Sequence, residues 1–181
     1  MNKIKRNKPN ILITGTPGTG KSSLAEQIAN SHQFNHFDIS QLVKEKGLDD
    51  GFDEEFQCLI IDEDKVCDEL EEPMCKGGCV VDHHSSEWFP ERWFDLVIVL
   101  QTDIQVLYKR LEKRGYIEKK ITNNIDCEIM QTMLDEALGA YKEEIVITLP
   151  SNNVEDSESN QAKISNWIEQ WQNINSLHSD I

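Results

Sequence analysis

Eight residues near the N-terminus constrain this chain more than any others. Residues 15–22 read Gly-Thr-Pro-Gly-Thr-Gly-Lys-Ser, which is the G-x-x-x-x-G-K-S pattern of a phosphate-binding loop. A short apolar, β-branched run precedes the motif at residues 10–14, and apolar residues at helical spacing follow it at residues 24–28. This order of strand, glycine-rich turn and helix is the context that the motif requires, and it disfavours a turn that binds nothing.

The residue types of this phosphate loop suit the binding of phosphate oxygens. Glycines adopt backbone torsions that other residues avoid, so that backbone N–H groups point inward and form a nest. The first turn of the following helix adds unpaired N–H groups and the positive end of its dipole. Lys21 then reaches the β- and γ-phosphates, while the hydroxyl of Ser22 is placed on Mg²⁺. The sequence thus predicts a phosphate site at Gly15, Gly18, Gly20, Lys21 and Ser22.

Strand and helix patterns alternate along the 181 residues, and we expect one domain without repeats. Apolar runs predict strands at about residues 10–14, 36–39, 79–82, 96–100 and 145–149. The helices predicted between them include a long one from about residue 123 to 144. The polar residues 151–160 are predicted to be a loop before a closing amphipathic helix. This alternation predicts a three-layer α/β fold, in which a five-stranded parallel sheet is flanked by helices.

The formal charge of −15 restricts the partners of the chain. It argues against non-specific nucleic-acid binding, and it requires that cations gather where phosphates bind. No run reaches the roughly 18 apolar residues that span a bilayer. Residues 1–8 are basic but lack the apolar segment of a secretory signal, so we expect an intracellular protein without membrane contact. These residues are expected to be a solvated tail, with an addressing or nucleic-acid-contacting arm as the alternative.

Two acidic side chains end predicted strands, where ligands of parallel sheets bind. Asp82 follows three apolar residues, like the second acidic motif of this nucleotide-binding class, which holds Mg²⁺ directly or through water. A cap or a surface strand end is the alternative. His84 lies two residues further on, where it would orient a water or contact a phosphate unless its role is structural. Asp38 stands at or near the end of the strand that precedes residues 40–46.

A group of cations follows the fourth predicted strand. Arg110 and Arg114 are four residues apart on a predicted helix and face the same way, and Lys119 and Lys120 follow the break at Gly115. Such a patch in an acidic protein is typical of a lid that brings cations onto transferring phosphates and excludes water. The alternative is a solvated helix end whose cations interact with the helix dipole.

Residues 49–64 concentrate acid: the stretch holds eight Asp or Glu residues and no Lys or Arg. One interpretation is a solvated loop and helix start. The other is a docking surface for a basic partner, with Phe52 and Phe56 as apolar anchors. The aromatic segment 88–93 is expected to pack in the core or cover the sheet edge.

Phosphate loop, Mg²⁺ carboxylate and lid together indicate phosphoryl transfer, which depends on positioning and charge neutralisation more than on covalent chemistry. A phosphate acceptor is itself nucleophilic and needs no general base. Beyond the phosphate loop, further segments carry a resemblance: Asp-Gly-Phe-Asp-Glu-Glu at 50–55, Val-Asp-His-His at 81–84, Phe-Pro-Glu-Arg-Trp at 89–93 and Arg-Gly-Tyr at 114–116. In this combination the chain resembles the adenylate kinase isoenzyme 6 family over about residues 9–172.

This resemblance implies a P-loop NTPase fold like that of adenylate kinase, with a nucleoside-monophosphate (NMP) region at about residues 38–61 and a short lid at about 113–123. It implies a broad-specificity kinase that uses ATP and Mg²⁺, accepts AMP and related NMPs, and also hydrolyses ATP. Ser23 and Arg114 join the phosphate loop as ATP contacts, and Asp82 and His84 match the Walker B pair that acts with Lys21. The NMP contacts are assigned to Asp38, Lys44 and Arg92, with Lys44 standing where arginine is expected in some relatives.

The same resemblance implies a second role, in maturation of the small ribosomal subunit. The partners would be the pre-ribosomal small subunit and, transiently, a basic ribosomal protein of its platform. The protein would occur in nucleus and cytoplasm as a monomer or weak homodimer, without sequence-specific DNA binding. Two interpretations therefore stay open: a metabolic kinase, or an assembly ATPase whose kinase activity is residual.

Overall fold

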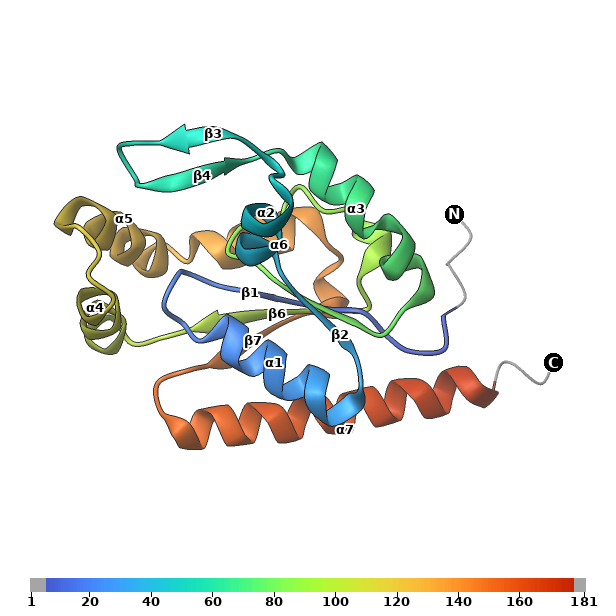
Figure 1. Ribbon diagram of the computed structural model, residues 1–181. Helices are drawn as coiled ribbons and strands as arrows, with labels where there is room; N and C mark the ends of the chain where they lie inside the picture. The colour runs from blue at the N-terminus through green and yellow to red at the C-terminus, as the bar shows by residue number, and fades with distance from the viewer. Residues whose placement is uncertain (1–5, 178–181) are drawn as a thin grey trace.

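A computed structural model describes residues 6–177 of the chain (Figure 1). The strands are β1 (Ile11–Thr14), β2 (Asn35–Asp38), β3 (Asp49–Asp53), β4 (Cys58–Ile61), β5 (Cys79–Asp82), β6 (Leu96–Gln101) and β7 (Val146–Pro150). The α-helices are α1 (Lys21–His32), α2 (Ile39–Lys46), α3 (Glu63–Lys76), α4 (Ile104–Lys113), α5 (Glu118–Ile129), α6 (Thr132–Ala140) and α7 (Val154–Leu177). In this part of the chain, no helix is long and apolar enough to cross a membrane.

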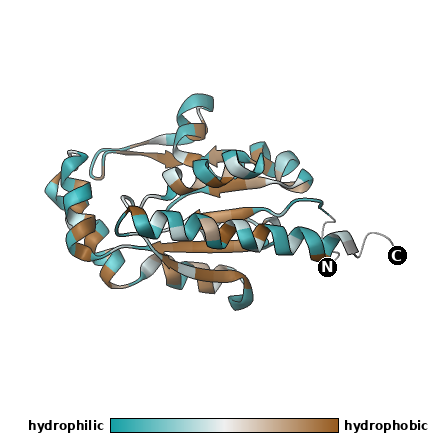
Figure 2. Ribbon diagram, turned by 90° about the horizontal axis from the view of Figure 1, so that it is seen from below, coloured by the Kyte–Doolittle hydropathy of each residue, from teal (hydrophilic) through white to brown (hydrophobic). Residues whose placement is uncertain are grey.

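Five strands form one parallel sheet in the order β2-β5-β1-β6-β7, which confirms the predicted α/β fold. Along β1 the side chains alternate: Ile11 and Ile13 pack with α1 and α7, whereas Leu12 packs with α2, α3 and α6 on the opposite face. The strands are accordingly the most hydrophobic part of the ribbon, while the outer sides of the helices are polar (Figure 2). Because all five strands run the same way, their carboxyl ends meet at one edge of the sheet.

The predicted long helix is wrong, because α5 and α6 are separate helices. Gln131 adopts a left-handed conformation with φ 55° between them. The two helices bury their apolar sides against different partners: Ile121 of α5 packs with Leu107 and Leu111 of α4, whereas Ala137 of α6 packs against the sheet. A single straight helix cannot make both contacts, so the helix is interrupted at Gln131.

The predicted loop at residues 151–160 is also wrong, since α7 already begins at Val154. The side chain of Asn153 accepts a hydrogen bond from the backbone N–H of Asp156 (2.8 Å), and the Asp156 carboxylate accepts one from the N–H of Asn152 (2.8 Å). This arrangement is a helix start of the capping-box kind. The acidic residues 49–61 are likewise not a loop: β3 and β4 form an antiparallel hairpin, here called the acidic hairpin.

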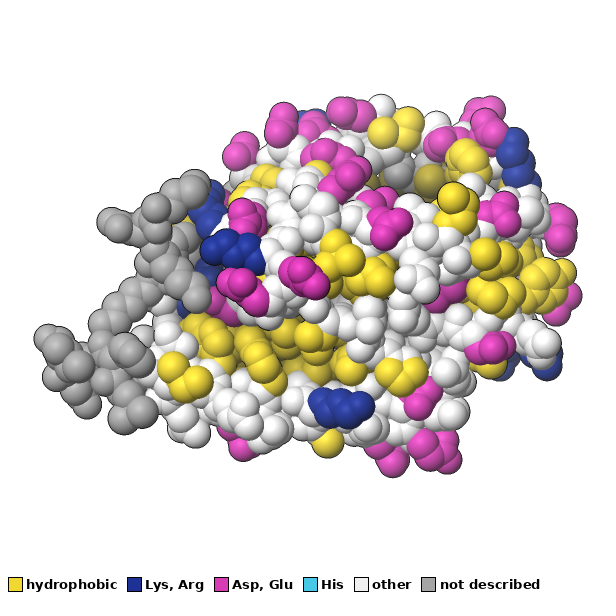
Figure 3. Space-filling view, turned by 180° about the vertical axis from the view of Figure 1, so that it is seen from behind, with side chains coloured by type: hydrophobic (Ala, Val, Ile, Leu, Met, Phe, Trp, Pro, Cys, Tyr) yellow, Lys and Arg dark blue, Asp and Glu magenta, His cyan; other side chains and the backbone are white. Residues whose placement is uncertain are grey.

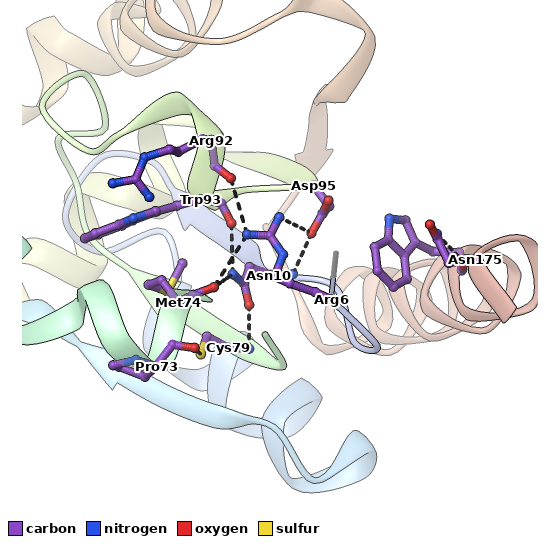
Figure 4. Close-up of polar contacts among 10 residues, drawn as sticks. Arg6, Asn10, Pro73, Met74, Cys79, Arg92, Trp93, Asp95 and Asn175 are labelled. Atoms are coloured by element: carbon purple, nitrogen blue, oxygen red, sulfur yellow. Dashed lines mark hydrogen bonds and ion pairs between the residues drawn. The ribbon is translucent and has the colours of Figure 1, made fainter. Parts of the chain in front are cut away.

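A buried polar network lies where the chain enters β1 (Figure 4). Arg6 and Asp95 form an ion pair of 2.9 Å with side chains that are each 2% exposed. Asp95 also accepts a hydrogen bond from the backbone N–H of Asn10 (3.0 Å), whose side-chain amide donates to the carbonyls of Met74 (2.8 Å) and Trp93 (2.9 Å). Arg6 is therefore buried, and Lys8 donates to the carbonyls of His32 (3.4 Å) and Gln33 (3.1 Å), so these two residues are not the solvated tail that we expected. The rest of that predicted tail, residues 1–5, lies outside the described residues.

Candidate functional site

The phosphate loop connects β1 with α1 at the carboxyl edge of the sheet. Its glycines are required sterically: Gly15 has φ 143°, and a Cβ atom there would lie 2.7 Å from the carbonyl oxygen of Leu100. The Lys21 ammonium donates hydrogen bonds to the carbonyls of Gly15 (2.8 Å) and Thr16 (3.2 Å). Burial lowers the pKa of Lys21 to about 8, against the opposing effect of the Asp82 carboxylate. Lys21 is thus a poorly solvated cation, which favours contact with an anion.

Asp82 of β5 lies directly across from the start of α1. Its Oδ1 accepts a hydrogen bond from the Ser22 hydroxyl (2.9 Å), and Asp38 Oδ2 lies 3.5 Å from the same hydroxyl. Asp82 Oδ2 contacts the ring of His36, which extends from β2. One hydroxyl and one carboxylate fit Mg²⁺, because this ion takes few protein ligands and completes its shell with phosphate and water oxygens. Ser22 and Asp82 would hold the ion.

His36 was not predicted as a site residue. In the parallel pairing of β2 with β5 it stands opposite Val80, so it reaches Asp82 diagonally. Partial burial opposes protonation of His36, but the hydrogen bond to Asp82 and the negative charges around it raise its pKa overall. The only hint in the sequence is the polar residues of the strand Asn35–Asp38. They indicate a site residue only when it is known that this strand lies beside β5.

His84 lies at the same edge, two residues beyond the end of β5. Its side chain is accessible to solvent, yet the surrounding protein removes enough water to lower its pKa to about 4, and the cations Lys21 and Lys120 act in the same direction. Its imidazole is therefore neutral near pH 7 and has one nitrogen that accepts a hydrogen bond.

A cleft of about 860 Å³ lies between the phosphate loop, α2, the acidic hairpin and the lid, and it is lined by Lys21, Ser22, Asp82 and His84 but not by His36. It brings together most of the predicted site residues: Gly18, Gly20, Lys21, Ser22, Ser23, Asp38, Lys44, Asp82, His84, Arg114 and Lys120. Asp38 also caps α2 by accepting the N–H of Gln41 (3.0 Å). Trp88, Phe52 and Phe56 contribute aromatic surface to the cleft. A cleft of this volume, with phosphate-binding groups on one side and apolar side chains of the acidic hairpin on the other, has room for two ligands.

The structure does not bring Arg92 to the cleft, contrary to its predicted NMP contact. Both of its terminal nitrogens donate to the carboxylate of Glu71 (2.9 Å each), which also accepts the indole N–H of the buried Trp93 (2.9 Å). Trp93 is fully buried, as expected for the aromatic segment. Arg92 thus orients a carboxylate on α3 and holds the segment in place.

The Glu71 carboxylate gives a testable pH effect. Its hydrogen bonds with Arg92 lower its pKa from 4.5 to about 2. Since the pKa is depressed on folding, the stabilisation is complete above about pH 4.5 and is lost as the pH falls through about 2. We expect Glu71→Gln to lower the free energy of unfolding at pH 7 by about 1 kcal/mol, since the pair is partly exposed.

Urea denaturation of both proteins at pH 7, 5 and 3 checks this expectation. The difference between wild type and Glu71→Gln should shrink towards pH 3, whereas Glu158→Gln, an exposed site on α7, should have little effect at any pH. A difference that is the same at all three pH values would contradict the assignment.

Arg110 is not a lid cation either. Its guanidinium donates to the backbone carbonyls of Gly18 (3.3 Å), Ser151 (2.8 Å) and Asn152 (3.0 Å). It therefore ties the phosphate loop to the turn between β7 and α7. Arg114, by contrast, lines the cleft with an exposed side chain. Although the two arginines are four residues apart, only Arg114 is available to a phosphate.

We expect substitution of Arg110 to lower stability and substitution of Arg114 to lower activity. Arg110→Ala removes a donor from three partly buried carbonyls, of which that of Ser151 keeps the Thr102 hydroxyl (3.0 Å), and this should cost about 1–3 kcal/mol of unfolding free energy. Arg114→Ala should leave stability unchanged and lower kcat by about 10²-fold. Thermal melts of both variants measure the effect on stability, and steady-state kinetics measure the effect on kcat. Equal loss of stability in both variants would show that this division of roles is wrong.

The lid and the acidic hairpin meet across the mouth of the cleft. Lys119 contacts the Glu55 carboxylate and lies 5.8 Å from the centre of the Phe56 ring. Lys119 is thus used by the hairpin and does not line the cleft, whereas Lys120 does. Within the hairpin turn, Asp53 accepts the backbone N–H groups of Glu55 (2.8 Å) and Phe56 (3.0 Å). Part of the acidic stretch therefore shapes the hairpin itself.

A phosphate loop after the first of five parallel strands, facing an aspartate on the adjacent strand, defines the class of P-loop kinases. Solved structures with this fold include a shikimate kinase from Acinetobacter baumannii in complex with shikimate (TM-score 0.62, 16% identity, 90% of this chain and 94% of that one). A gluconokinase from Sinorhizobium meliloti 1021 is also similar (TM-score 0.53, 15% identity, 91% and 98%). At this identity the likeness concerns the fold alone.

Sequence comparison identifies the family. A family model described as an AAA domain matches residues 11–131. The chain is 69% identical over 168 residues to the adenylate kinase isoenzyme 6 homolog of Dictyostelium discoideum, covering 93% of this chain and 96% of that protein. It is 47% identical to the homolog of Drosophila melanogaster, covering 91% of this chain and 94% of that protein. It is 46% identical to the homolog of Schizosaccharomyces pombe, covering 94% and 98%. The chain belongs to the adenylate kinase isoenzyme 6 homolog family.

Proposed function

We propose that this protein is an NMP kinase that transfers the γ-phosphoryl group of ATP to AMP and related NMPs with Mg²⁺. The cleft carries this proposal, because it places Lys21, Asp82 and Arg114 on one side and the acidic hairpin with α2 on the other. The names of the relatives support an adenylate kinase activity.

The mechanism follows from the side chains of the cleft. The loop N–H groups and Lys21 bind the β- and γ-phosphates, and Ser22 and Asp82 would hold Mg²⁺, which supplies charge neutralisation at those oxygens when bound. A phosphate oxygen of the NMP forms a bond to the γ-phosphorus while the bond to the β–γ bridging oxygen breaks, so two nucleoside diphosphates result. Arg114 and Lys120 neutralise charge from the lid, and neutral His84 accepts a hydrogen bond from a water or ligand hydroxyl.

Turnover of ATP with Mg²⁺, with and without AMP, tests this proposal when ADP and inorganic phosphate are followed separately. A kinase produces two ADP per ATP in the presence of AMP, with little phosphate. Release of phosphate at a rate that AMP does not change would refute transfer as the main activity and leave an ATPase.

As a second function we propose a role in maturation of the small ribosomal subunit, in nucleus and cytoplasm, through a basic ribosomal protein of the platform. The exposed apolar side chains of the acidic hairpin favour it: Phe52 is 56% and Ile60 48% exposed beside carboxylates. Acidic side chains are also frequent and basic ones few on the rear face (Figure 3).

The test has to spare the carboxylates that shape the hairpin. Asp53 accepts turn hydrogen bonds and Glu55 contacts Lys119, so charge reversal there would disturb the cleft. Asp50→Lys/Glu54→Lys changes two exposed carboxylates outside the lining of the cleft, and it is expected to weaken binding of the basic protein at least tenfold while AMP-dependent turnover persists. Unchanged binding would remove the hairpin as the docking surface.

A further inference from the structure

A carboxylate that no motif covers connects the phosphate loop with the lid helix. Glu128, near the C-terminal end of α5, accepts the hydroxyl hydrogen of Thr16 at Oε2 (2.5 Å) and the backbone N–H of Thr102 at Oε1 (2.7 Å). Both donors belong to buried residues. One side chain thus joins three elements: the phosphate loop, the turn after β6, and α5.

Several hydrogen bonds within the phosphate loop converge on Thr16. Its carbonyl accepts the backbone N–H (3.2 Å) and the hydroxyl (2.9 Å) of Thr19, as well as the ammonium of Lys21 (3.2 Å). A shift of Thr16 would therefore move the groups that contact the phosphates. The hydrogen bond from Thr16 to Glu128 therefore acts on the residue at which these contacts of the loop converge.

The helix that carries Glu128 begins in the lid and also carries four cleft-lining residues, namely Lys120, Asn123, Asn124 and Cys127. Its first turn packs on α4 through Ile121 and reaches the acidic hairpin through Lys119. The hydrogen bond from the Thr16 hydroxyl to Glu128 connects this helix with the phosphate loop.

A carboxylate close to a phosphate site repels the ligand unless its charge is compensated. Here both oxygens accept hydrogen bonds, and the negative charge of Glu128 is among those that favour the protonated form of Lys21, though burial has the largest effect on that pKa. The arrangement therefore suits a group that orders the loop while each of its oxygens accepts a hydrogen bond from the protein.

We propose that Glu128 is a positioning residue for ATP, which holds the phosphate loop in its binding conformation through Thr16 and links it to the lid helix. The inference rests on the proposed function only in that the nucleotide is ATP. It assigns no contact between Glu128 and the nucleotide.

Two variants remove the link from opposite sides. Glu128→Ala and Thr16→Val are each expected to raise the Kd for ATP with Mg²⁺ by about 10- to 100-fold, because the loop loses its fixed geometry. The KM for ATP should rise with it, while the KM for AMP stays within twofold. The double variant should be no worse than the poorer single variant, since both changes break one interaction.

Three comparisons separate positioning from a merely structural role. Glu128→Gln keeps an acceptor for the Thr102 N–H and a donor for the Thr16 hydroxyl, so it should recover most of the affinity. Asp126→Ala removes an exposed carboxylate from the same helix and should bind ATP like the wild type. Thermal melts report folding, and if Glu128→Ala does not fold, Thr16→Val and Glu128→Gln still decide.

Calorimetric titration with ATP and Mg²⁺ provides the readout without turnover. The proposal is overturned if folded Glu128→Ala and Thr16→Val bind ATP within twofold of the wild type, or if only their melting temperatures fall. Because binding is measured directly, a protein that fails to phosphorylate AMP refutes the proposed function and leaves this test intact.

Discussion

Lys21→Met is expected to lower both AMP-dependent transfer and ATP hydrolysis by about 10³-fold, because the ammonium is the buried cation of the phosphate loop. The side chain of methionine has a similar length but brings no charge to the β- and γ-phosphates. Steady-state production of ADP and phosphate measures the loss. Lys142→Met, at an exposed site outside the cleft, is the matched control.

This variant should remain folded. The pKa of Lys21 is lowered to about 8 in the folded protein, so keeping it protonated near pH 7 costs stability, and removing the charge should leave the melting temperature unchanged or higher. Retained turnover in a folded Lys21→Met protein would refute the phosphate-loop mechanism. A collapse of the melting temperature would instead show that the loop depends on its own lysine.

Asp95→Asn is expected to cost about 3–5 kcal/mol of unfolding free energy, the largest effect on stability that we predict. The asparagine still accepts the N–H of Asn10, but Arg6, at 2% exposure, loses its counter-charge and keeps only neutral acceptors such as the carbonyls of Met74 (3.5 Å) and Arg92 (3.3 Å). Breaking one side of a buried ion pair is costly because the remaining charge stays desolvated. Denaturation in urea measures the difference in unfolding free energy.

The double variant Arg6→Met/Asp95→Asn tests whether the unpaired charge causes the loss of stability. Removing both charges should recover at least half of the loss, since neither group then remains buried and unpaired. If the double variant is as unstable as the sum of Asp95→Asn and Arg6→Met, the ion pair is not the source of the effect.

The fold and the phosphate side of the site were accessible from sequence because they depend on local patterns. Gly15 to Ser22 form a contiguous motif, and Asp82 follows an apolar run, so the parallel sheet alone brings them together. His36 and Glu128 were missed, because their roles arise from contacts between residues that are 46 and 112 positions apart. No local pattern records such distances.

Misassigned cations show a second limit. Arg92 and Arg110 look like phosphate ligands in sequence, but a guanidinium satisfies its five donors with whatever acceptors lie near. For Arg92 these are the oxygens of Glu71, and for Arg110 they are backbone carbonyls of the turns around the phosphate loop. Charge and spacing identify a cation, whereas the tertiary structure selects its partner.

The left-handed residue Gln131 follows the C-terminal end of α5, and a rotation of the helix about that end would move its first turn furthest. A helix of 12 residues is about 18 Å long, so a rotation of about 10° there would displace Lys119 by about 3 Å. Glu128 lies only three residues from Gln131 and would move by less than about 1 Å. Such a rotation would change the width of the cleft at the Lys119 end, whereas the hydrogen bond between Glu128 and Thr16 would persist.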